Sequence, residues 1–231
     1  MSLQNPYDDS YFAIRSGAVF VTIVIAIAQT WIIHAINLNF TGNIPIWLLP
    51  LTTSVLLLIS IFAHQTNHRL HPKWNRGFSI AIVAWVAFVN FICLVWFVYD
   101  MLNPQTVTVS HILLLAGMAL WVVNVCIFAL AYWEIDSGGP EIRALGLPTI
   151  FRKKEYPDFV FPQQSDSNPQ LSPENWIPRF TDYFYLAVTN STSFVPATPL
   201  PYSATAKLMA ATQSLLSFLT IGLIIARALS L

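Results

Sequence analysis

The sequence predicts an all-α protein, a polytopic bundle of transmembrane helices with about five full helices plus one short or half-membrane helix. Of 231 residues, 55% are apolar and only 10% are charged, and the mean hydropathy is +0.59. A soluble domain carries about 25% charged residues. Long apolar stretches recur along the chain, each close to the roughly 20 residues that a helix needs to cross about 30 Å of hydrocarbon. Basic residues gather in alternate loops, as they do in multi-pass membrane proteins. Lipid is therefore the expected solvent.

Residues 1–133 are predicted to form a four-helix transmembrane region. Its apolar stretches contain no Lys, Arg, Asp or Glu, and they are Gly17–Asn37, Ile46–Ala63, Phe78–Tyr99 and Ile112–Trp133. The first stretch is interpreted as a retained anchor, because Asp8 and Asp9 precede it and a signal peptide has a basic start. Tyr132 and Trp133 end the fourth stretch, where amphipathic rings favour the headgroup level.

Residues 134–179 are predicted to be a proline-rich cytoplasmic loop. Its prolines, Pro140, Pro148, Pro157, Pro162, Pro169, Pro173 and Pro178, are too frequent for long helices or central strands. Phe159, Phe161 and Trp176 are expected to pack back on the bundle, so that the loop caps the cytoplasmic face. A docking surface for a partner is the alternative interpretation.

Two acidic residues, Glu134 and Asp136, lie where the fourth helix is expected to end. A carboxylate at a helix C-terminus opposes the helix dipole. We therefore expect an ion pair with a basic residue, and Arg143 or Arg179 could serve.

Residues 180–231 have the layout of a channel-like hairpin: a short polar helix, a proline-rich turn and a long helix. Phe180–Val195 spans only about 24 Å at 1.5 Å per residue, so it either crosses a thinned bilayer or dips in as a half-helix. Thr181 or Asp182 is suited to cap it. The last apolar stretch is Ala206–Leu231, in a helix expected to begin near Ser203.

The positive-inside rule places the N-terminus and the 134–179 loop in the cytoplasm, for a protein of the cell (inner) membrane. With six crossings the C-terminus is also cytoplasmic, and only Lys207 among the basic residues lies outside. If Phe180–Val195 merely dips in, the last helix ends outside, which fits Arg227 less well.

Uncharged polar residues cluster in this apolar setting and are the candidate site residues. The candidates for lining a pore or contacting a neighbouring helix are Thr189, Asn190, Ser191, Thr192, Ser193, Gln213 and Ser217. Asn90 and Asn124 lie mid-helix and are predicted to make interhelical polar contacts, since a buried amide in lipid needs a partner. A second stripe on the last helix, Ala206, Ala210 and Ser214, has the small residues that let helices approach closely.

No catalytic residue, metal or cofactor is predicted. His64, His68 and His71 would share a helix face, but Pro72 follows at once and no Cys or acidic ligand is near, so a basic interfacial belt is the better interpretation. No catalytic motif of a known intramembrane or hydrolytic type is present, which argues against an enzyme. Cys93 and Cys126 are expected to pack as small apolar residues without a disulfide. The balanced charge gives no basic field for nucleic acid.

Several segments carry a resemblance to a family. Phe128–Glu134, Asp158–Pro162, Asp182–Tyr185, Gln213–Phe218 and Ala226–Ala228 resemble a family of uncharacterised bacterial multi-pass membrane proteins that includes the DUF1345 group. This resemblance implies a multi-pass membrane protein and brings no catalytic residues.

The hairpin is also distantly similar to the two-helix pore domain of potassium channels. Thr192–Pro196 falls where the potassium filter would be, yet no glycine occurs between Gly146 and Gly222. Such a filter needs glycines for its backbone angles, and Pro196 fixes its own φ. A potassium-type filter is therefore excluded.

Two hypotheses for function follow. The first is a channel-like pore or transport component, formed by a homo-oligomer and lined by the hairpin's polar residues. The second is a structural or partner-binding membrane subunit, in which the same residues only hold helices together. The lipid bilayer is the expected partner in both.

Overall fold

The chain is an all-α helical bundle, as the sequence predicts. A computed structural model describes residues 6–35, 52–53, 55–56, 72–102, 110–144, 157–165, 176–192 and 199–229. Among these residues, three helices are long and apolar enough to cross a membrane: Arg76–Leu102, His111–Gly138 and Ala204–Leu229. A shorter apolar helix covers Phe20–Ala35. The predicted stretch Ile46–Ala63 lies outside the described residues except at 52–53 and 55–56, which are helical.

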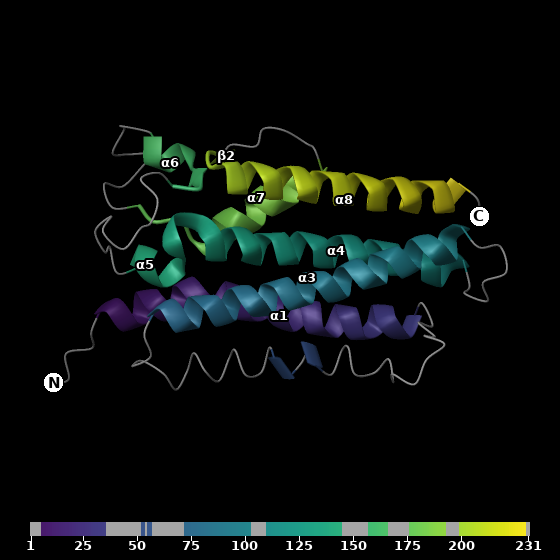
Figure 1. The fold of residues 1–231 in the computed structure, drawn as a ribbon, viewed down its shortest axis with the longest axis horizontal. Coiled ribbons are helices and arrows are strands. Elements are labelled where there is room, and N and C mark those ends of the chain that lie inside the picture. Colours follow the sequence, from purple (N-terminus) through teal and green to yellow (C-terminus); the bar gives the residue numbers. More distant parts are fainter. Residues whose placement is uncertain are drawn as a thin grey trace.

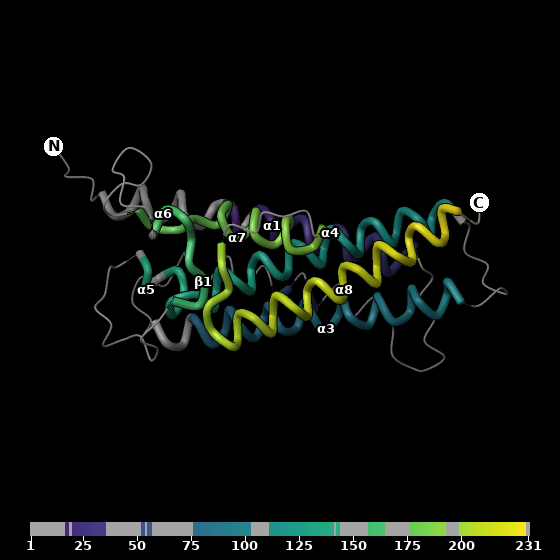
Figure 2. The backbone as a smooth tube through the Cα atoms, turned by 90° about the horizontal axis from the view of Figure 1, so that it is seen from above, coloured from purple at the N-terminus to yellow at the C-terminus, as the bar shows by residue number. Residues whose placement is uncertain are grey.

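Helix α4 (Ser110–Ile135) is the central helix of the bundle. It packs against α1 (Pro6–Ala35), α3 (Pro72–Leu102), α7 (Phe180–Thr192) and α8 (Ala204–Leu229). Figures 1 and 2 show these helices side by side along the long axis of the molecule. The uninterrupted buried run from Val123 to Ile127 follows from this position, because neighbours cover α4 on every side.

The end of α4 is fixed by the Ser-Gly-Gly-Pro sequence that follows it. A 3-10 turn, η1 (Asp136–Gly138), leads through Gly139 into the short helix α5 (Pro140–Ala144). Gly139 has φ 102°, a left-handed conformation that glycine adopts without steric cost. The chain thus turns sharply at the end of the bundle.

The described part of the 134–179 loop contains only short elements, as its prolines predict. Strand β1 (Phe159–Val160) is followed by helix α6 (Pro162–Ser165). β1 pairs antiparallel with β2 (Leu200–Pro201), with Phe159 opposite Pro201. This two-stranded pair places the residues just before α8 at the end of the bundle where α4 terminates.

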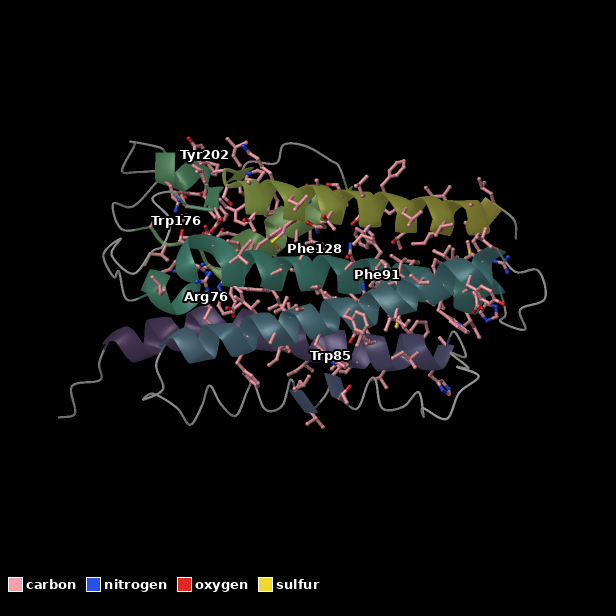
Figure 3. All side chains as sticks on the ribbon, in the orientation of Figure 1. Arg76, Trp85, Phe91, Phe128, Trp176 and Tyr202 are labelled. Atoms are coloured by element: carbon pink, nitrogen blue, oxygen red, sulfur yellow. The ribbon has the colours of Figure 1, made fainter. Side chains whose placement is uncertain are left out.

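Helices α7 and α8 both begin at that same end. Phe180, the first residue of α7, packs against Trp133 near the end of α4, with ring centroids 5.9 Å apart. Just before α8, the Ser203 hydroxyl donates to Asp158 Oδ1 at 2.5 Å, beside β1. Arg76, Trp176 and Tyr202 lie at this end in Figure 3. We call it the loop end of the bundle.

Helix α7 therefore enters the bundle and the chain returns to the loop end before α8 begins. Its 13 residues span about 20 Å at 1.5 Å per residue, against about 39 Å for the 26 residues of α8. A chain that enters and leaves at one end of the bundle follows the path of the half-helix alternative for Phe180–Val195, and its placement in a membrane stays a prediction.

The first and last described helices place the two ends of the chain at opposite ends of the bundle. α1 begins at the loop end and α8 finishes at the opposite end (Figure 1). Lys207, in the first turn of α8, is consequently at the loop end, and Arg227, in its last turn, is at the far end. Which end faces the cytoplasm stays a prediction.

Candidate functional site in the hairpin

Three polar side chains meet where α4, α7 and α8 pack together. The Tyr132 hydroxyl donates to Gln213 Oε1 at 2.6 Å, and Asn190 Nδ2 donates to the same oxygen at 2.9 Å. Gln213 Nε2 donates to the carbonyl of Ala187 at 2.8 Å. Gln213 is fully buried, and both ends of its amide have partners. We call Tyr132, Asn190 and Gln213 the amide cluster.

The amide cluster extends along both polar stripes of α8. Asn190 Nδ2 also lies 2.9 Å from the carbonyl of Ala210, and the Ser214 hydroxyl donates to Asn190 Oδ1 at 3.1 Å. The stripe of small residues thus lets α7 approach α8 closely, as predicted. On the other stripe, Asn124 Nδ2 of α4 donates to the buried Ser217 hydroxyl at 3.1 Å.

The hydroxyls of α7 bond mostly to their own helix. Thr189 donates to the carbonyl of Tyr185 at 2.9 Å, and Ser191 and Thr192 both donate to Val188, at 2.9 and 3.1 Å. Such bonds satisfy a hydroxyl in an apolar setting without a partner helix. Ser193 lies outside the described residues.

The structure thus divides the predicted site residues. Asn190, Gln213, Ser217 and Asn124 are brought together as interhelical contacts, whereas Thr189, Ser191 and Thr192 are not. Asn90 is buried on α3, but its Oδ1 accepts no hydrogen bond from the described residues. Tyr132 has a role that the sequence does not indicate: it is fully buried inside the bundle, where its hydroxyl binds Gln213.

A second polar centre surrounds Asp136, which is fully buried at the end of α4. Its Oδ1 accepts the backbone N–H groups of Asp158 and Phe159, at 3.0 and 3.2 Å. Its Oδ2 accepts the Tyr183 hydroxyl of α7 at 2.5 Å. A buried carboxylate is tolerated when such charge-assisted bonds replace its water. Asp136 therefore ties the loop and α7 to α4.

Arg143 completes this centre. Its guanidinium donates to the carbonyls of Trp133 and Asp136, at 2.8 and 2.5 Å, and lies 5.1 Å from the centroid of the Tyr183 ring. A cation is favourable at these terminal carbonyls because it complements the helix dipole. The expected partner, Arg143, is thus present, but it binds main-chain carbonyls, and the Asp136 carboxylate is satisfied by neutral donors.

Aromatic side chains connect the two polar centres. The Phe159 ring lies 5.0 Å from that of Tyr132 and 6.4 Å from that of Tyr183. Phe161 packs between Tyr183 and Trp176, at 5.2 and 5.6 Å. These loop residues pack back on the bundle, as the sequence predicts, and they cover the loop end of the hairpin.

Capping residues fix where each helix of the hairpin begins. Asp182, the third residue of α7, accepts the backbone N–H of Arg179 at 2.7 Å, as the third helical residue does toward the N-cap position in a capping box. The Ser203 hydroxyl accepts the N–H of Ala206 at 3.1 Å and caps α8, whose predicted start near Ser203 is confirmed.

Among the described residues, no three His, Cys, Asp or Glu side chains lie close enough together to hold a metal ion. His64, His68 and His71 lie outside those residues. Cys93 and Cys126 are buried and free, without a disulfide.

No family model matches the chain, and it matches no curated protein and no solved structure.

Proposed function

We propose that the chain is a non-enzymatic structural or partner-binding membrane subunit, and that its C-terminal hairpin is a locked element without a pore. The observation that carries the proposal is the burial and full pairing of Gln213. Its amide holds α4, α7 and α8 together through Tyr132, Asn190 and the carbonyl of Ala187.

A polar side chain that lines a pore presents a donor or acceptor to water. Gln213 and Ser217 are both 0% exposed, and their polar atoms bond to other helices of the same chain. Interhelical hydrogen bonds of this kind are worth roughly 0.6–2 kcal/mol each in a membrane. The polar residues of the hairpin therefore serve cohesion.

The channel-like pore is the second candidate, and the path of the chain favours it. A full helix, a half-helix and a second full helix, with the half-helix entering and leaving at one end, is the layout of a pore hairpin. Non-helical backbone at membrane depth either is buried in protein or lines a water-filled cavity. Thr189 and Thr192, both only partly buried, are the side chains through which an oligomer would line such a cavity.

Two measurements separate the candidates. Purified protein in liposomes is tested for the movement of ions and small uncharged solutes, with protein-free liposomes as the control. The subunit proposal expects flux at the lipid background, together with a second membrane protein that co-purifies in mild detergent and is seen by native mass spectrometry. Flux above background that falls in a Thr189→Leu/Thr192→Leu variant would establish the pore instead. A bare monomer without flux would refute both.

A further inference from the structure

Two buried amides in the other half of the bundle have oxygens without a donor. Gln29 on α1 is 0% exposed and Asn90 on α3 is 6% exposed. Gln29 Oε1 and Asn90 Oδ1 accept no hydrogen bond from any residue that the structure describes. Burying an amide oxygen without a hydrogen-bond donor costs free energy in an apolar environment, so we expect a donor beside each oxygen.

The Gln29 amide reaches the turn of α3 that Asn90 follows. Gln29 Nε2 donates to the carbonyl of Val86 at 3.1 Å. A helical carbonyl points toward the residue four positions later, which here is Asn90. The Asn90 side chain in turn leans back toward the N-terminal end of α3, because the Cα–Cβ bonds of a helix tilt that way. This geometry places both amides at the turn from Val86 to Asn90.

One small molecule can donate to both oxygens. Water has the two O–H donors that two amide oxygens require. Buried waters typically satisfy otherwise unpaired polar groups in this way.

The surroundings favour a neutral ligand over an ion. Ile25, Ile32, Val86 and Val89, which flank the two amides in sequence, are all buried and apolar. The chain has no Lys, Arg, Asp or Glu from Gly17 to Asn37 or from Phe78 to Tyr99. Trp85 and Phe91, on either side of the turn, lie toward the middle of the long axis in Figure 3. An ion at this depth would have no compensating charge on these two segments.

We propose that a water molecule binds between Gln29 Oε1 and Asn90 Oδ1, near the middle of the membrane, and joins α1 to α3. One O–H group donates to each oxygen. The site is separate from the amide cluster and does not rest on the proposed function, since no residue of that cluster lies on α1 or α3.

Radiolytic hydroxyl labelling of the purified full chain in nanodiscs tests this site, because radicals formed from a bound water modify the side chains beside it. The chain offers a matched pair of buried free thiols. Cys93 is 0% exposed and three residues after Asn90, hence on a neighbouring position of the same face. Cys126 is 4% exposed and lies on α4. Bulk radicals reach neither thiol.

We expect Cys93 to be modified several-fold faster than Cys126 in the unaltered protein. In a Gln29→Leu/Asn90→Leu variant, the rate at Cys93 should fall to that of Cys126. Equal rates at the two thiols in the unaltered protein would overturn the proposal, and that comparison needs no variant to fold. A fast rate at Cys93 that persists in the folded double variant would overturn it as well.

Discussion

Replacing Gln213 with leucine tests whether the amide cluster holds the hairpin together. The substitution keeps a side chain of similar size and removes the amide. The Tyr132 hydroxyl loses its acceptor at 2.6 Å, Asn190 loses one acceptor at 2.9 Å, and the Ala187 carbonyl loses a donor at 2.8 Å. With three interhelical bonds at an average of about 0.6 kcal/mol, the lost bonding alone is about 2 kcal/mol. The Tyr132 hydroxyl, buried and without its acceptor, adds about 1 kcal/mol.

The free energy of unfolding, measured by titrating detergent-solubilised protein with a denaturing detergent, should therefore fall by about 3 kcal/mol. Thr212→Leu is the matched control. Thr212 is the preceding residue, it is exposed, and its hydroxyl bonds only to the carbonyl of Leu208 in its own helix. This variant should be as stable as the unaltered protein. A Gln213→Leu variant of unchanged stability, or an equal loss in Thr212→Leu, would refute the locked hairpin.

Three further predictions concern packing, the buried carboxylate and a helix cap. Gly117→Ala should lower the free energy of unfolding by about 1–3 kcal/mol, because a Cβ there would lie 2.8 Å from atoms of Phe97 and Ile224. Gly222→Ala is the control: a Cβ there has no atom within 4 Å, so the free energy of unfolding should not change in the same titration. Asp136→Ala should lower the free energy of unfolding by about 3 kcal/mol and make the 134–179 loop sensitive to limited proteolysis. A loop that stays resistant to the protease would contradict the role of Asp136 in tying the loop to α4. Ser203→Ala should cost about 3 kcal/mol, because it removes both the cap of α8 and the bond to Asp158 Oδ1. Thr205→Ala, at an exposed position two residues later, should leave the unfolding free energy unchanged.

The long helices could be predicted from the sequence because a membrane demands length and apolar character at once. Phe78–Tyr99 and Ile112–Trp133 lie within α3 and α4, and Gly17–Ala35 lies within α1. Helix ends were predictable where a local signal exists, such as Gly138-Gly139-Pro140 after α4.

The path of the hairpin was not predictable in the same way. Counting basic residues cannot distinguish the two paths, because re-entry of α7 merely exchanges Lys207 and Arg227 between the two ends of the bundle. The path is set by contacts between distant segments. β1 pairs with β2, and Asp158 holds Ser203 across 45 residues. Two-residue strands leave no periodic pattern that the sequence could reveal.

The candidate site was partly predictable. Amides and hydroxyls stand out in apolar helices, which is why Asn124, Asn190, Gln213 and Ser217 could be named. Tyr132 was missed as their partner, since a tyrosine near the end of an apolar stretch is typical of the headgroup level. The pairing of Asp136 with neutral donors was missed because those donors come from backbone and hydroxyl groups, which carry no charge signal.

Cysteine accessibility from the two sides of the membrane tests the re-entrant hairpin most directly. In a background with Cys93→Ala and Cys126→Ala, single cysteines replace Gln164 in α6, Tyr202 before α8 and Leu229 at the end of α8, all three exposed. An impermeant thiol reagent should label the cysteines at 164 and 202 from one side of sealed vesicles, and the cysteine at 229 from the other. Labelling at 164 and 202 from opposite sides would show that α7 crosses the membrane, and would contradict the account.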